Sequence, residues 1–171
     1  MNDNRKLFAL DGKILPPQGL LFALLVQVPA ILWCWPLRPG MTSLSVGSGF
    51  VLAGVVLNLC ANRLFVRNRI GVCPFSPVGQ VIRNGPFRFT RNPMYLGMVL
   101  ICAGTALATG LYVNLCAAVL LAAWLHFRFV LPEEKFLQEQ PGLDYLLYAC
   151  RTSRWLGLPG ARLVPTPESK L

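Results

Sequence analysis

Apolar residues gather in four long runs along this chain of 171 residues, and the segments between them are polar or rich in proline and glycine. The runs cover about residues 20–35, 44–64, 95–108 and 112–130. Runs of this length and hydropathy are typical of helices that cross a bilayer, which need about 17–25 residues. The pattern therefore predicts an all-α fold, a polytopic membrane helix bundle of about four spans, or five.

The connections between the runs differ in character. Only a tight uncharged turn near Gly110 separates the last two runs, which predicts an antiparallel helical hairpin. The segment 65–94 contains repeated glycines and prolines, which favour ordered turns over a helix. Long loops in compact proteins are often functional. We therefore expect a single integral membrane domain over 1–171, with 65–94 as one of its cytosolic catalytic elements.

The chain after the fourth run predicts a second cytosolic element, over residues 131–155. A helix is expected from Pro132, broken at Pro141-Gly142 and resumed through Arg154. Glycines and prolines after Trp155 predict a disordered tail over 156–171. The tail helix carries tyrosines, arginines and a tryptophan, which suit an interfacial anchor. The same residues could also close over a cofactor.

The charge of the chain predicts its orientation. It carries a formal net charge of +9, yet 54% of its residues are hydrophobic, which excludes a soluble nucleic-acid binder. Between the second and third runs lie five arginines and no acidic residue: Arg67, Arg69, Arg83, Arg88 and Arg91. Because positive residues collect in cytoplasmic loops, both termini and this loop are expected in the cytoplasm. In a bacterium the location would be the cytoplasmic membrane.

Metal and disulfide chemistry find little support in the sequence. None of the six cysteines forms a C-x-x-C pair, and most lie within apolar runs, where a free cysteine behaves as a small hydrophobe. The single histidine, His126, has no second histidine or cysteine at ligand spacing. We therefore expect no metal site.

The start of the third run is the first candidate for chemistry. Arg88 and Arg91 precede it, and Asn92 and Pro93 occupy the positions where a helix would begin. Pro93 suits the first turn, and Asn92 could cap its exposed amides. A helix start flanked by arginines can bind an anion. Arginines here could equally anchor the helix to lipid headgroups.

Residues on either side of the third and fourth runs extend this candidate site. Tyr95 and Gly97 follow in the first turns of the third run, where Gly97 could let a ligand or another helix approach the backbone. Glu133 and Glu134 are the first carboxylates after Asp11, and they follow Pro132 directly. They suit the first turn of a helix, but carboxylates also accept hydrogen bonds from ribose hydroxyls. A charged cofactor could therefore bind beside the lipid.

These residues together resemble a known family. The matching segments are Gly85-Pro86-Phe87-Arg88, Arg91-Asn92-Pro93-Met94-Tyr95-Leu96-Gly97, Pro132-Glu133-Glu134 with Leu137, and Tyr145 with Tyr148. They are similar to those of the isoprenylcysteine carboxyl methyltransferases and the related phospholipid methyltransferases. The resemblance covers roughly residues 81–155. Many relatives have histidine where this chain has Asn92, and asparagine cannot titrate near neutrality, so a general-base role there is in doubt.

The resemblance implies an integral membrane methyltransferase that uses S-adenosyl-L-methionine. It implies cofactor-binding roles for Arg91, Asn92, Tyr95, Gly97, Glu133 and Glu134. The acceptor would be lipophilic and would enter from the bilayer: an isoprenoid carboxylate, a lipid amine or a thiol. We expect Arg128 or Arg88 to orient an anionic group of that substrate. The sequence leaves the acceptor and the oligomeric state open.

Two other functions are compatible with the sequence. A relative could keep this scaffold but reduce lipids with a nicotinamide cofactor, although membrane sterol reductases of that kind are usually much longer. A small transporter or membrane assembly factor would need no catalysis. Transport of polar solutes requires polar residues deep in the spans, and the runs offer little beyond Gln27, Asn58, Asn114 and His126.

Overall fold

A computed structural model describes residues 15–33, 40–68, 81–139 and 145–157. Within these ranges the chain is helical and forms no β-strand, which confirms the all-α prediction. The elements are α2 (Pro16–Trp33), α3 (Met41–Arg67), η1 (Gly85–Arg88), α4 (Pro93–Ala108), η2 (Tyr112–Asn114), α5 (Leu115–Leu125), η3 (His126–Val130), α6 (Leu131–Glu139) and α7 (Tyr145–Arg151). The tail predicted to be disordered falls mostly outside the described residues, as does the break at Pro141-Gly142.

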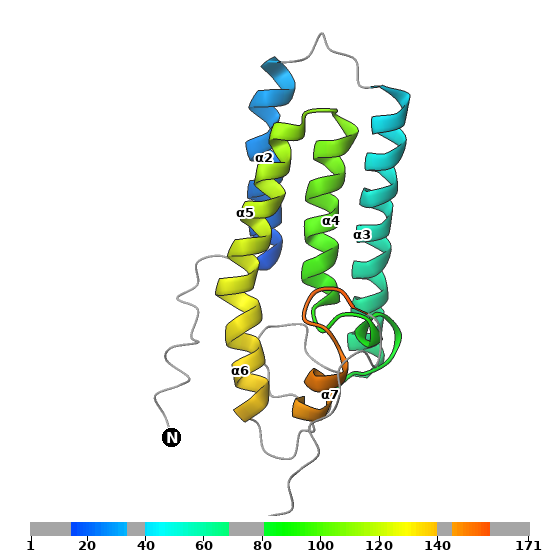
Figure 1. Ribbon diagram of the computed structural model, residues 1–171, viewed down its shortest axis with the longest axis vertical. Coiled ribbons are helices and arrows are strands. Elements are labelled where there is room, and N and C mark those ends of the chain that lie inside the picture. Colours follow the sequence, from blue (N-terminus) through cyan, green and yellow to red (C-terminus); the bar gives the residue numbers. More distant parts are fainter. Residues whose placement is uncertain (1–14, 34–39, 69–80, 140–144, 158–171) are drawn as a thin grey trace, which may run out of the picture.

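Helices α2, α3, α4 and α5 lie side by side along the long axis of the molecule (Figure 1). Three helices are long and apolar enough to cross a membrane, at Pro16–Trp33, Met41–Arg67 and Tyr112–Glu139, and α4 is a shorter apolar helix. The turn after α4 contains Gly110 in the left-handed region, with φ of 70°, as the predicted hairpin requires. The start of α4 and helices α6 and α7 lie at the end of the molecule opposite the turn that contains Gly110.

Helix α3 is longer than the run from which it was predicted. It begins three residues before Leu44 and ends at Arg67, three residues after Leu64. Much of its surface is exposed and apolar, for example Leu52 at 65% exposure, and the same holds for Phe22 on α2 at 69%. Exposed apolar faces of this size suit contact with lipid chains. The protein is an integral membrane protein.

Helices α3 and α4 touch backbone to backbone through four glycines. A Cβ at Gly54 would lie 2.6 Å from the Gly97 carbonyl oxygen, and one at Gly104 would lie 2.7 Å from the Val51 nitrogen. A Cβ at Gly47 would collide with the backbone of α4. Small residues permit such close approach between membrane helices. Gly49, on the same helix, has open space around it instead.

A buried polar side chain joins α2 to α4. Gln27 is 1% exposed, and its amide nitrogen donates to the Cys102 carbonyl oxygen at 3.2 Å and contacts the Cys102 sulfur at 3.1 Å. Its amide oxygen accepts from the Thr105 hydroxyl at 3.1 Å. Both ends of the amide therefore have partners, and the network fixes how α2 is rotated against α4.

Gln27→Leu is expected to lower the free energy of unfolding by about 0.6–1.7 kcal/mol, from the average to the maximum measured for hydrogen bonds between membrane helices. The reason is that leucine fills the space but cannot donate to the Cys102 carbonyl, although the Thr105 hydroxyl keeps that carbonyl as a partner at 2.8 Å. Reversible unfolding in mixed micelles, followed by circular dichroism, measures the difference. An unchanged unfolding midpoint would contradict a role for this network in holding α2.

The helix that begins at α5 continues into α6 through a π-helical turn, η3. The Leu131 N–H bonds to the His126 carbonyl, one residue further back than in an α-helix. Pro132 follows, and a proline inside a helix has no N–H to donate and crowds the preceding turn. The wider turn accommodates Pro132 without a break, so the helix predicted to start there is a continuation of the fourth span.

Candidate functional site

The segment after α7 crosses over the start of α4. The Arg91 N–H donates to the Ser153 carbonyl at 2.9 Å, and the Gly157 N–H donates to the Phe89 carbonyl at 3.2 Å. We name residues 152–157 the C-terminal strap. Because these are backbone bonds, they fix the strap on the loop 89–92 whatever the side chains do.

Side chains of the loop bind the strap at one more point. The Asn92 amide donates to the Arg154 carbonyl at 3.0 Å, and the Thr90 hydroxyl donates to the same oxygen at 3.2 Å. Asn92 does occupy the N-cap position of α4, with Pro93 in the first turn as expected. Its side chain, however, makes no capping bond. The predicted cap is therefore wrong, because the Arg154 carbonyl takes the Asn92 side-chain amide.

Two arginines surround Glu134. Glu134 is 4% exposed, and its Oε2 accepts from both Nε and Nη2 of Arg154, at 2.9 and 2.8 Å. Its Oε1 lies 3.4 Å from Nη2 of Arg91, whose side chain is also buried. The hydrogen bond to Glu134 raises the pKa of Arg154. The two arginines bring the strap and the start of α4 together around the Glu134 carboxylate of α6.

Glu133 has a different partner. The Tyr95 hydroxyl donates to Glu133 Oε2 at 3.0 Å, which joins the first turn of α4 to α6. The Tyr95 ring lies 6.2 Å from that of Phe129, centroid to centroid, within the bundle core. The two neighbouring glutamates are therefore separated in role: Glu134 faces arginines, whereas Glu133 faces a phenol.

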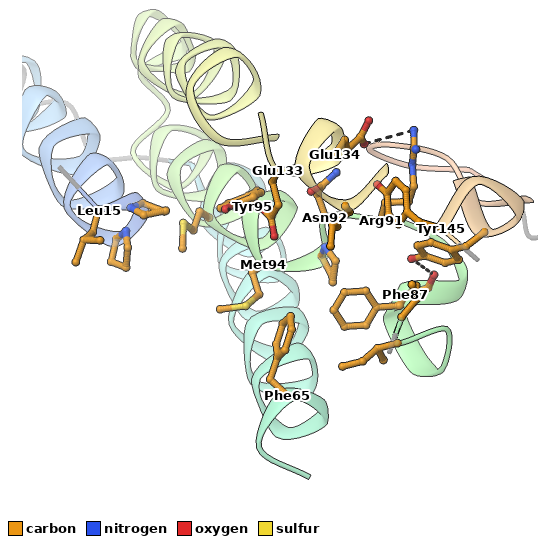
Figure 2. A pocket seen from close by; sticks show the side chains of 18 residues that line it. Leu15, Phe65, Phe87, Arg91, Asn92, Met94, Tyr95, Glu133, Glu134 and Tyr145 are labelled. Atoms are coloured by element: carbon orange, nitrogen blue, oxygen red, sulfur yellow. Dashed lines mark hydrogen bonds and ion pairs between the residues drawn. The ribbon is translucent and has the colours of Figure 1, made fainter. Parts of the chain in front are cut away.

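One cavity of about 300 Å³ at the end of the bundle is lined by Arg91, Asn92, Tyr95, Glu133 and Glu134, among others. Figure 2 shows Arg91, Glu134 and Tyr145 on one side of it and Leu15, Met94 and Phe65 on the other. Tyr95 and Glu133 lie between Leu15 and Arg91 in this view. The cavity thus has a charged part, built by α4, α6 and α7, and an apolar part to which α2 and α3 also contribute.

Two tyrosines of α7 belong to the charged part. Burial, more than any charge, raises the pKa of Tyr145, and the Glu134 carboxylate raises it further, so the phenol stays protonated. Burial likewise raises the pKa of Tyr148. The Tyr148 hydroxyl donates to the Phe87 carbonyl at 2.8 Å, which ties α7 to η1.

Comparison with protein families identifies the group to which this arrangement belongs. The phospholipid methyltransferase family matches residues 42–142, more than half of the chain. The chain belongs to the phospholipid methyltransferase family. No curated protein and no solved structure matches it. The resemblance noted in the sequence is confirmed at the family level.

The family match extends from α3 to just beyond α6, so it includes the site residues of α4 and α6. Membership supports a methyltransferase that works in the membrane. The match ends before α7 and the C-terminal strap, which supply Tyr145, Tyr148 and Arg154 to the site of this methyltransferase.

The structure brings together five of the residues to which the sequence gave a site role. Lining the cavity are Arg91, Asn92, Tyr95, Glu133 and Glu134. Gly97 does not line it. A Cβ at Gly97 would collide with the Asn58 amide and lie 2.8 Å from the Gly54 carbonyl oxygen, so this glycine admits α3. The sequence left open whether Gly97 admits a ligand or another helix. In the structure, helix α3 lies against Gly97.

Neither predicted substrate-orienting arginine reaches the cavity of this family member. Arg88 is exposed at the end of η1, and Arg128 is exposed on η3, with its guanidinium carbon 5.8 Å from the Phe129 ring centroid. The expectation that Arg88 or Arg128 orients the substrate stays a prediction, and it would require these side chains to act from outside the lining of this cavity.

The sequence missed the second arginine of the site. Arg154 was part of a tail interpreted as an interfacial anchor or as a cover over a cofactor, and it lies 20 positions from its partner Glu134. Thr90, only 2% exposed between Arg91 and Phe89, was also missed. A polar residue beside the motif arginine was a local signal for Thr90, whereas no spacing rule pointed to Arg154.

Proposed function

We propose that this protein transfers a methyl group from S-adenosyl-L-methionine to a lipophilic acceptor at the cytosolic face of the membrane. The observation that supports this most is a donor and an acceptor left open inside a buried ion cluster. Glu134 Oε1 and Arg91 Nε are buried and make no hydrogen bond within the described residues, and the contact of Oε1 with Nη2 of Arg91 is a long ion pair of 3.4 Å. Unpaired polar atoms in a buried site are costly, so a ligand that pairs both would be bound favourably.

The chemistry of these two atoms fits the cofactor. Glu134 Oε1 would accept from ribose hydroxyls, and Arg91 Nε would donate to the carboxylate of the amino-acid part. Asn92 and Tyr145 line the same part of the cavity. When bound, S-adenosyl-L-methionine supplies an electrophilic methyl group on a sulfonium. Arg154 lies outside the lining of the cavity. It acts as a positioning residue, because its guanidinium binds Glu134 Oε2 from outside the cavity.

The apolar part of the cavity would receive the acceptor. Its walls come from the first turn of α2, from Phe65 on α3 and from Met98 on α4. Methyl transfer depends mainly on the alignment of nucleophile and methyl group, so walls that position a substrate supply much of the catalysis. A carboxylate acceptor needs no base, whereas an amine must lose a proton. Glu133 lines the cavity and, among the described residues, has a phenol rather than a cation as its partner.

The orientation of the protein follows from the arginines at this end of the bundle. Exposed arginines of α3, η1 and α7 gather at the end that carries the cavity: Arg63, Arg67, Arg88 and Arg151. Because cytoplasmic segments carry the positive residues, we place the cavity on the cytoplasmic side.

Calorimetric titration of the detergent-purified protein with S-adenosylhomocysteine tests the proposal. We expect saturable binding of one equivalent with a micromolar dissociation constant, because two buried charged groups gain partners. The reduced nicotinamide cofactors serve as the comparison and should not bind. Folded protein that binds the nicotinamide and not S-adenosylhomocysteine would overturn the proposal.

A further inference from the structure

A second concavity lies on the lipid-facing side of the bundle, between α2 and α5, away from the cavity described above. Its volume is about 500 Å³, and it is lined by Gly19, Phe22 and Val26 on α2 and by Ala117, Leu120 and Trp124 on α5, among others. Apart from Gln18, its lining is apolar. We name it the α2/α5 groove.

Gly19 sets the depth of the groove at one end. A Cβ there would collide with the Trp124 ring, with another ring carbon at 2.8 Å, so the indole lies directly against the α2 backbone. Residues 18–26 of α2 extend about 12 Å along the helix axis at 1.5 Å per residue. The groove therefore extends along α2 and α5, and this elongated lining suits a hydrocarbon chain.

Aromatic side chains connect the groove with the cavity. The Trp124 ring meets the Phe129 ring edge to face, with centroids 5.1 Å apart, and Phe129 in turn lies beside Tyr95. Phe129 is fully buried and belongs to the π-helical turn η3. One aromatic side chain thus separates the lipid-facing groove from the Tyr95–Glu133 pair.

Helix α2 also contributes residues to both the cavity and the α2/α5 groove. Pro16 and Pro17 line the cavity, while Gln18 and Gly19 line the groove. A molecule with its polar end in the cavity and an apolar tail leaving past the first turn of α2 would find the groove next to it. Phe22 and Leu120, about 70% exposed each, keep the groove accessible from the bilayer.

We propose that the α2/α5 groove binds the single long hydrocarbon chain of the methyl acceptor. This inference rests on the proposed function, and it assigns the acceptor to amphiphiles with an aliphatic or isoprenoid chain and a small polar end. The apolar lining, the contact with bilayer lipid and the nearness of the cavity all favour such a chain over a second protein copy.

Quenching of Trp124 fluorescence by a brominated octadecanoic acid in maltoside micelles tests the groove. Trp33, Trp35 and Trp155 are replaced by phenylalanine, so that Trp124 is the sole tryptophan. We expect saturable quenching, because a chain held in the groove brings bromine against the indole. Quenching that rises linearly with the mole fraction of the probe, without saturation, would overturn the proposal.

Matched variants give the assay its specificity. Ala117→Phe fills the groove from α5 and should raise the half-saturating probe concentration at least about tenfold. Val119→Phe is its control, because Val119 is exposed on the same helix but does not line the groove. On α2, Val26→Phe and Val28→Phe form the equivalent pair. Equal effects of both members of a pair would contradict a chain in the groove.

Two further outcomes separate this inference from its premise. If S-adenosylhomocysteine binds but Trp124 shows no saturable quenching, the groove proposal fails while the methyltransferase proposal stands. If quenching saturates without S-adenosylhomocysteine binding, the function fails and the groove remains a lipid site. If Ala117→Phe converts a dimer to a monomer and leaves quenching unchanged, a second copy covers the groove and the proposal is overturned.

Discussion

Glu134→Gln is expected to weaken the binding of S-adenosylhomocysteine by roughly 10- to 100-fold. Hydrogen bonds to a charged group contribute about 1.5–3 kcal/mol, and each 1.4 kcal/mol is a factor of ten in the dissociation constant. Glutamine keeps the size of the side chain but removes the charge that two arginines share. The glutamine amide nitrogen would also place N–H donors against the N–H donors of the arginines, where no hydrogen bond can form. Calorimetric titration measures the loss.

Glutamine is a better test than alanine here. Removing one member of a buried ion pair costs about 3–5 kcal/mol because the remaining charge is left without a partner, so alanine endangers the fold. Glu139→Gln is the matched control, since Glu139 is exposed at the end of the same helix. Both variants should elute as the parent does in size-exclusion chromatography. A folded Glu134→Gln protein with parental affinity would remove Glu134 from the proposed site.

Gly54→Leu is expected to separate α3 from α4 and to lower the free energy of unfolding by about 3 kcal/mol, the upper end of what overpacking costs. The first carbon of the side chain would lie 2.6 Å from the Gly97 carbonyl oxygen and 3.0 Å from the Ile101 nitrogen. Backbone atoms cannot rotate away, so the helices have to move apart. The midpoint of thermal aggregation in detergent measures the loss of stability.

Gly49→Leu supplies the comparison on the same helix. A Cβ at Gly49 meets nothing within 4 Å, so leucine there should be neutral or slightly stabilising, given its higher helix propensity. If the two variants aggregate at the same temperature, helix propensity alone would account for both, and close packing of α3 on α4 would be contradicted.

The sequence was sufficient for the fold class and for five of the residues that line the candidate cavity. Hydropathy located each of the four helices, because a bilayer allows few alternatives to a long apolar helix. It placed the end of α3 at Leu64, whereas the helix continues to Arg67, since an arginine can extend its charged end to the interface from a helical position. Arg91 and Glu134 were found because each stands in a motif.

Other features could not be predicted, because they depend on the path of the chain in space. The Arg154–Glu134 pair requires the strap to return across α4, and no periodicity encodes that return. The Asn92 side chain was assigned by the preference of its residue type for helix starts, and a more distant carbonyl proved the stronger partner. Gly97 was ambiguous because a glycine suits a ligand and a helix equally, although the seven-residue spacing of Gly47 with Gly54 and of Gly97 with Gly104 was present in the sequence.

The position of Arg154 has a consequence for biosynthesis. The ribosome makes α3, α4 and α6 before the strap, so Arg154 is the last member of the ion cluster to be made. Until the strap lies across loop 89–92, Glu134 faces Arg91 without Arg154. The cluster can therefore close only after the segments that carry Arg91 and Glu134 have been synthesised.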